Sequence, residues 1–416
     1  EPGRPAIPIR TTGAAAAAAA ARAAEFAVEG LRSNWIVDDG RLRPVPAMYP
    51  LEKSNRTVAG TSAGVVAARI SECCRIVGVQ AKFDDTDASA FLTTFENVEI
   101  GVFLWRGKKS DGVEGCVIVE VQRMYGEAAT YHKYCCDILD AAEGNFSEEG
   151  FTAEKKKEKA RTETAQKMMA GQIEPSEQRK SLWLALETVS ALFKSRQIDS
   201  YELALQSLSF LTDPEQSGFD SALMASKVFL SGSGADIVTP CANKGRGDLV
   251  IKEAVLSLVL SGRIFAGGRR LEGFPHGNNL RSLGLTVITN AICMLEKSNS
   301  DTKKESHESD FLVVNSFLAD AEKIGGQDLL CVLLKELSCA RSNVHNACLS
   351  AQCLRSLCEV SNEARHRIKD QGAEQIAVDA LSVGRRASMR LEKASGHFLP
   401  SLVGQKRPRV EISCGT

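Results

Sequence analysis

The sequence predicts a mainly α-helical protein in which a stack of helices follows a small α+β domain. Apolar helical segments recur from about residue 180 to residue 396, with almost no alternating strand pattern between them. Within that span, residues 351–381 give a helix, a polar break, a short helix that ends at Gly372 and a third apolar helix. A helix pair that is apolar on two sides has to be buried by further copies of itself, so a stacked helical repeat is expected.

The N-terminal residues 1–57 have the composition of a low-complexity tail. Ala14–Ala21 is an unbroken alanine run, and half of the 12 prolines of the chain fall in this region. No helical or strand period is sustained, so we expect residues 1–57 to be disordered or to form a loose helix.

Residues 58–145 predict a compact α+β domain. Its first helix places Val66, Ile70 and Cys73 at helical spacing. Runs rich in β-branched and aromatic residues then predict three or four antiparallel strands, at 79–83, 90–96, 98–106 and 115–123. A closing helix at 127–144 ends at a glycine. Helix, sheet and helix in this order are similar to the kinase-associated C-terminal domain and place both helices on one face of the sheet.

The rest of the chain predicts helices. Residues 146–178 are highly charged and indicate a linker or a solvated helix. Residues 179–400 predict an all-helical domain, with turn-forming residues between the segments 180–196, 200–212, 219–231, 247–262, 278–297, 309–324, 327–341, 344–360, 362–371 and 373–396. Residues 401–416 follow the last helix as a basic, flexible tail.

Two units of the helical region can be overlaid. Gly326-Gln327-Asp328 before LLCVLLKEL matches Gly372-Ala373-Glu374 before QIAVDAL, and the two units are 46 residues apart. Asn362, Arg365, Ile368 and Gly372 fall where the armadillo repeat family has its N-x-x-R-x-x-I-x-x-x-G junction. The chain thus resembles an armadillo-type repeat protein, and this resemblance implies an armadillo-like α-solenoid that binds proteins.

The same resemblance selects Asn290 as a candidate peptide-binding residue. Asn290 in LTVITNAI stands at the asparagine position of the third-helix pattern, and Ser356 occupies the equivalent position nearer the C-terminus. An asparagine amide offers both a donor and an acceptor to the backbone of an extended peptide. The alternative is that Asn290 faces solvent or satisfies the end of a helix.

The interior of the helical domain also follows from this pattern. Gly372 ends a helix and should adopt a left-handed backbone conformation. We expect a core between repeats that contains Cys353, Leu354, Leu357 and Ile376. Cysteines five residues apart on one helix are rotated by about 140°, so the clustered cysteines of this region should be core residues and not metal ligands.

Composition restricts the partners and the compartment. The 51 basic and 52 acidic residues leave a net charge of -1, which gives no general reason to expect nucleic-acid binding. The 13 cysteines are odd in number and contain no C-x-x-C, so we expect an intracellular protein, cytoplasmic or nuclear. The sequence contains no P-loop, G-x-G-x-x-G or H-E-x-x-H, and we expect neither an enzyme nor a bound cofactor or metal.

Two basic groups could bind a partner. Arg106, Lys108, Lys109 and Arg123 could form a basic rim on the sheet domain that meets acidic lipid or an acidic protein segment, although a solvated hairpin loop explains the same residues. Lys406, Arg407 and Arg409 give the K-R-x-R pattern of a nuclear import signal, and such tetrads also arise by chance.

The function expected from these observations is that of a non-enzymatic protein–protein interaction scaffold that uses a helical-repeat surface. The alternative is a regulatory protein whose α+β domain docks on acidic membrane lipid or on a kinase-like partner. An enzyme is the remaining alternative, and no set of catalytic residues can be assembled for it from the sequence.

Overall fold

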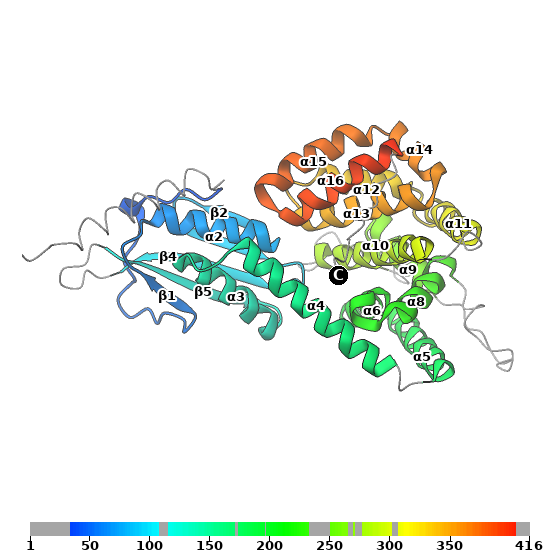
Figure 1. Cartoon of the computed structure of the whole chain (residues 1–416), viewed down its shortest axis with the longest axis horizontal. Coiled ribbons are helices and arrows are strands. Elements are labelled where there is room, and N and C mark those ends of the chain that lie inside the picture. Colours follow the sequence, from blue (N-terminus) through cyan, green and yellow to red (C-terminus); the bar gives the residue numbers. More distant parts are fainter. Residues whose placement is uncertain are drawn as a thin grey trace, which may run out of the picture. The chain divides into compact units, whose positions relative to one another are not determined.

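The computed structural model describes residues 34–107, 115–170, 174–195, 197–232, 250–264, 269–270, 277–301 and 307–404. The chain divides into two compact units (Figure 1), and the boundary in sequence falls between Phe151 and Thr152. The first unit also includes Arg386–Ser388. The predicted fold class is confirmed, because a small antiparallel sheet with helices is followed by a stack of helices. In the part of the chain that is described, no helix is both long and apolar enough to cross a membrane.

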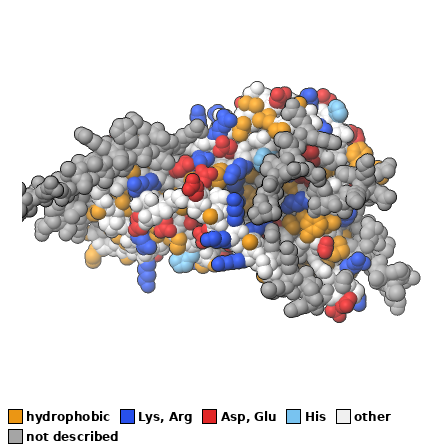
Figure 2. Space-filling view, in the orientation of Figure 1, with side chains coloured by type: hydrophobic (Ala, Val, Ile, Leu, Met, Phe, Trp, Pro, Cys, Tyr) orange, Lys and Arg blue, Asp and Glu red, His pale blue; other side chains and the backbone are white. Residues whose placement is uncertain are grey.

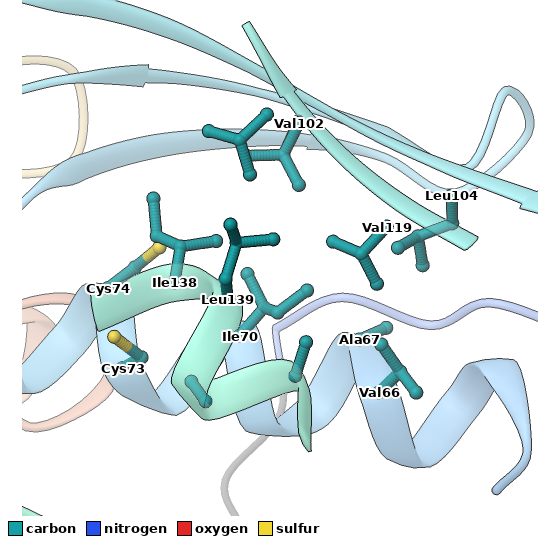
Figure 3. Packing of buried hydrophobic residues seen from close by; sticks show 14 of the residues in the cluster. Val66, Ala67, Ile70, Cys73, Cys74, Val102, Leu104, Val119, Ile138 and Leu139 are labelled. Atoms are coloured by element: carbon teal, nitrogen blue, oxygen red, sulfur yellow. The ribbon is translucent and has the colours of Figure 1, made fainter. Parts of the chain in front are cut away.

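The first unit is built on a five-stranded antiparallel sheet. Its strand order is β1-β5-β4-β3-β2, and the elements are β1 (Asn55–Val58), α2 (Ala63–Val77), β2 (Gln80–Asp84), β3 (Ser89–Thr93), β4 (Glu99–Arg106), β5 (Val117–Tyr125) and α3 (Ala128–Glu143). Both helices cover one face of the sheet, where Val102 and Val119 of the strands meet Ile70 and Ile138 of the helices (Figure 3). The helix ends follow from local sequence, since α2 ends at Gly78 and α3 at Gly144, both with positive φ.

The prediction of a disordered segment 1–57 is wrong for residues 34–57. Trp35 is buried and its ring stacks on Phe83 with a centroid distance of 5.3 Å. Val37 and Leu42 join the same core, and β1 adds a fifth strand beside β5. These apolar residues occur singly in an irregular segment, so they show no period, yet each fills a position at the margin of the sheet core. Residues 1–33, with the alanine run, lie outside the described residues.

The second unit is a stack of helices. Its elements are α4 (Glu148–Ala170), α5 (Pro175–Lys194), α6 (Ile198–Thr212), α7 (Pro214–Ser217), α8 (Phe219–Ser231), α9 (Ile251–Ser261), α10 (Gly277–Asp301), α11 (His307–Gly325), α12 (Leu329–Ser338), α13 (Val344–Val360), α14 (Asn362–Asp370), α15 (Ala373–Ala387) and α16 (Met389–Val403). Helix α4 crosses the unit boundary and occupies most of the charged segment 146–178. In the stack, α13 packs between α10 and α16, and α10 also packs on α6 and α8 (Figure 1).

Three details of the helical prediction are corrected. The region 179–400 is not purely helical, because β6 (Arg263–Ile264) and β7 (Arg269–Arg270) form a short antiparallel ribbon. The segment 373–396 forms two helices, α15 and α16, which are separated at Ser388. Helix α16 also continues to Val403, so the tail begins later than residue 401. It continues because Phe398 and Leu402 keep the apolar spacing of the helix and are both buried.

The predicted core between helices is confirmed except at one residue. Cys353, Leu354 and Leu357 of α13 are completely buried. Ile376 of α15 is only half-buried, and the buried stripe of α15 consists instead of Ala373, Ala377, Ala380 and Gly384. Gly372 has the predicted left-handed conformation, with φ of 75°.

Candidate functional site

A structured polar site lies on the outer face of the sheet, which we define as the face opposite α2 and α3. Side chains alternate along β4, so Val102 and Leu104 face the helices, whereas Phe103 and Trp105 lie on the outer face. Across the β4–β5 pair, Phe103 lies opposite Glu120, which therefore also lies on the outer face.

Four aromatic rings form a row along the outer face. Tyr49 contacts Trp105 with a centroid distance of 5.5 Å, Trp105 stacks on Phe103 at 6.3 Å, and Phe103 meets Phe91 edge to face at 6.3 Å. These separations are in the range of favourable aromatic pairs. The row runs from a covered end at Tyr49 to an open end at Phe91, whose side chain is 50% exposed.

Glu120 is completely buried beneath the covered end of the row. Its carboxylate accepts hydrogen bonds from Trp105 Nε1 at 2.9 Å, from the Tyr49 hydroxyl at 3.2 Å and from the Glu52 backbone N–H at 2.8 Å. Among the described residues, no cation forms an ion pair with Glu120. Burial of a carboxylate costs free energy unless its oxygens accept hydrogen bonds, and these three neutral donors offset that cost.

Residues 45–53 cover this carboxylate, and we call them the strap. The Tyr49 hydroxyl oxygen also accepts a hydrogen bond from Gln122 Nε2 at 2.6 Å, so the phenol is held on two sides. Burial raises the pKa of Tyr49, and the negative charge of Glu120 raises it further by a smaller amount. The phenol therefore remains a donor at neutral pH. Beside the strap, the Arg43 guanidinium lies 5.9 Å from the centroid of the Trp105 ring.

The predicted basic rim is not brought together. Arg106 lies opposite Val117, whereas Arg123 lies opposite Ile100, so the two arginines occupy opposite ends of the β4–β5 pair. Six residues of extended strand separate these ends by about 20 Å. Arg106 donates to the backbone carbonyl of Gly40, and Arg123 donates to that of Gly126, so each is engaged locally. Lys108 and Lys109 lie outside the described residues.

The remaining candidate residues are Asn290, which the structure describes, and the basic residues of the tail, which it does not. Asn290 is half-buried on α10, and its amide donates to the backbone carbonyl of Ser209 on α6 at 3.4 Å. That contact joins two helices of the stack, and a role in peptide binding stays a prediction. The basic tail residues Lys406, Arg407 and Arg409 lie outside the described residues.

Polar groups inside the helical stack pair between helices. Arg355 of α13 makes a bidentate ion pair with Glu296 of α10, with N–O distances of 2.8 and 2.6 Å. Ser356 donates a hydrogen bond to the same carboxylate at 2.6 Å. Nearer the start of α10, Arg281 donates to Glu336 of α12 at 2.9 Å. These contacts fix α10 against its neighbours. In the described ranges no three His, Cys, Asp or Glu residues are grouped so as to hold a metal ion.

The surface of the helical stack exposes a pair of large apolar side chains on one helix. Leu203 and Phe210 of α6 are each 51% exposed and lie seven residues apart, which places them on the same side of the helix. Apolar side chains are visible at the surface in the region of α6 and α8 (Figure 2).

Sequence reasoning missed Glu120 and Tyr49. A signal for Glu120 was present, because GCVIVEVQR places one acidic residue in the middle of an apolar strand. No local signal marks Tyr49, which belongs to a segment without periodicity. Neither the protein-family models nor the curated proteins with which the sequence was compared include a match to it.

Proposed function

We propose that this protein is a non-enzymatic interaction scaffold and that its helical stack, an armadillo-like solenoid, binds a protein partner. The observation that carries the proposal is the apolar pair Leu203 and Phe210 on the exposed side of α6. Exposed apolar groups rimmed by polar residues are typical of protein-binding surfaces.

The rest of α6 supports a rigid presentation of this pair. Its other side is completely buried through Tyr201, Leu205 and Leu208, and the helix packs on α5, α8 and α10. The Tyr201 hydroxyl donates to the backbone carbonyl of Ala254 at 2.8 Å, which fixes α6 against α9. A helix held in this way can present Leu203 and Phe210 to a partner with little loss of conformational entropy.

Half-buried ion pairs between helices of the stack support a scaffold more than an enzyme. The Glu296–Arg355 and Arg281–Glu336 pairs join helices to one another. An intracellular location, in the cytoplasm or the nucleus, is part of the proposal. It is supported by the free thiols of the cysteines that the structure describes, because such thiols suit a reducing compartment.

The test is proximity labelling with the full chain as bait in cells. We expect the double substitution Leu203→Glu and Phe210→Glu to remove the partners that the unmodified chain labels, since it places two charges in an apolar contact. Leu312→Glu on α11 is the matched control, because Leu312 is a 61% exposed leucine of the same stack outside α6. An unchanged partner set for the double variant, or equal loss with the control, would refute binding through α6.

The alternative, docking of the α+β unit on acidic lipid, would require the basic rim to act as one surface. Arg106 and Arg123 lie at opposite ends of the β4–β5 pair, which does not favour that arrangement. Flotation of the chain with phosphatidylserine vesicles, compared with neutral vesicles, tests it. Charge-dependent flotation that Arg106→Ala and Arg123→Ala together abolish would support the lipid alternative.

A further inference from the structure

The outer face of the sheet already holds one occupant, the strap of residues 45–53, and its contacts show what chemistry the face accepts. The strap's hydrogen bonds to β5 end on Glu120 and Gln122, and Asn55 of β1 donates to the Glu52 backbone carbonyl. Tyr49 supplies the ring and the hydroxyl, and Glu52 supplies a backbone N–H three residues later. A tyrosine followed at that spacing by a free N–H is therefore the pattern that the site accepts.

The floor of this site belongs to the sheet and does not depend on the strap for its position. Glu120 and Gln122 lie on β5 and Trp105 on the adjacent β4, and both strands are paired on either side. Trp105 Nε1 donates to Glu120 from within the sheet at 2.9 Å, so the carboxylate is oriented whether or not the strap is present. A charged acceptor held by a rigid element in this way favours specific recognition.

The strap itself has features of a replaceable cover. It contains no strand or helix, and Met48 within it has a left-handed φ of 73° and an almost completely exposed side chain. A left-handed backbone is unfavourable for a residue other than glycine, so release of the strap would relieve this conformation. Opening would also return the buried Glu120 carboxylate to water, which offsets part of the lost contacts.

The strap leaves part of the aromatic row open. Phe91 is 50% exposed and Met124 is 54% exposed, and both lie on the outer face beyond Phe103. A segment of another protein that occupies the Tyr49 position could extend over these side chains as well. Such a segment would remove more apolar surface from water than the strap does, which gives it an advantage over the strap.

We propose that the outer face is a binding site for an extended, tyrosine-containing segment of a partner protein, and that the strap occupies this site until such a segment displaces it. The tyrosine ring stacks on Trp105, its hydroxyl donates to Glu120 and accepts from Gln122, and a backbone N–H three residues later donates to Glu120. This site belongs to the first unit, so it is independent of the function proposed for the helical stack.

The probe is a fluorescent synthetic peptide with the sequence of residues 43–54, and fluorescence anisotropy measures its binding to the full chain. In the Tyr49→Ala variant the strap has lost its ring and hydroxyl, and we expect saturable binding of the peptide. The affinity of the peptide for the unmodified chain should be lower by about tenfold or more, because the covalently attached strap competes at high effective concentration.

Changes in the peptide separate recognition from folding of the protein. A peptide with phenylalanine in place of tyrosine should bind the Tyr49→Ala variant about tenfold more weakly, because it loses a hydrogen bond to a charged group. A peptide with alanine there should not bind measurably. No binding of the unaltered peptide, or equal binding of the tyrosine and alanine peptides, would overturn the proposal.

A second variant guards against failure of Tyr49→Ala to fold. Tyr49→Phe keeps the ring against Trp105 and removes only the hydroxyl, so it should bind the unaltered peptide more tightly than the unmodified chain does. Circular dichroism confirms folding of both variants. If Tyr49→Phe is folded and gains no affinity for the peptide, the strap does not compete for this site.

Discussion

A close backbone approach at a glycine of the helical stack gives the sharpest stability prediction. Gly384 lies in α15, and a Cβ atom added there would stand 2.4 Å from Glu392 N and 2.9 Å from the Leu391 carbonyl carbon. Both atoms belong to the backbone of α16, so no side-chain rotation can make room. Ordinary Cβ contacts begin at 3.4 Å, and Gly384→Ala therefore forces the two helices apart locally.

The size of the effect follows from two opposing terms. Overpacking of a closely packed interior costs about 1–3 kcal/mol. Replacing glycine by alanine inside a helix stabilises the helix by about 1 kcal/mol. We expect Gly384→Ala to lower the free energy of unfolding by up to about 2 kcal/mol, the difference between these terms.

Gly396 of α16 provides the matched control. A Cβ atom at Gly396 would meet only the Leu381 side chain, at 3.8 Å, which is an ordinary contact. Gly396→Ala keeps the gain in helix propensity without the clash and should stabilise the protein by up to about 1 kcal/mol. The difference between the two variants isolates the overpacking term.

Urea unfolding followed by far-ultraviolet circular dichroism measures both variants. The unfolding midpoints can be compared as free energies where the denaturant slopes agree and one transition is seen. Opposite shifts of the midpoint for Gly384→Ala and Gly396→Ala are the expected result. If Gly384→Ala is as stable as Gly396→Ala, the close approach of α15 and α16 at this glycine is wrong.

Three further predictions concern the helical stack. Leu357→Ala should lower the free energy of unfolding by about 2–5 kcal/mol, whereas Leu312→Ala at the exposed surface should change it little; similar losses in urea unfolding would contradict the assigned burial. Gly372→Ala should cost about 1–2 kcal/mol from its positive φ alone, because its Cβ would meet no atom within 4 Å, and an unchanged midpoint would argue against this backbone conformation. The hydrogen bond from Lys252 lowers the pKa of Asp320 in the folded protein. The stabilisation that Asp320→Asn removes should therefore be present above the ordinary aspartate pKa of 3.8 and should disappear as the pH falls through the lower folded pKa. A stability difference between the two proteins that does not vary with pH would exclude this linkage.

Much of the secondary structure was determined by local sequence. The apolar period and the flanking turn residues located α8 at 219–231 and α13 at 344–360 without error, and they located β4 within one residue. Glycine caps located the ends of α3 and α14, since a left-handed residue is needed there whatever packs nearby. The order of sheet followed by helices also follows from these periods alone.

The candidate sites, in contrast, depended on tertiary structure. The register of β4 and β5 placed Arg106 and Arg123 at opposite ends of the pair, and the crossing of α6 and α10 gave the Asn290 amide a backbone partner. Neither fact can be read from spacing along one helix or strand. Both depend on which residues of separate elements come within hydrogen-bond distance.

The strap shows the same division most clearly. The sequence by itself determined that residues 45–53 form no regular element, because prolines interrupt them and no apolar period is present. Only the tertiary structure decided that this segment is ordered, since the order comes from Glu120, more than 65 residues away in the chain. A buried carboxylate must find donors wherever the fold can supply them, and periodicity carries no information about such long-range pairing.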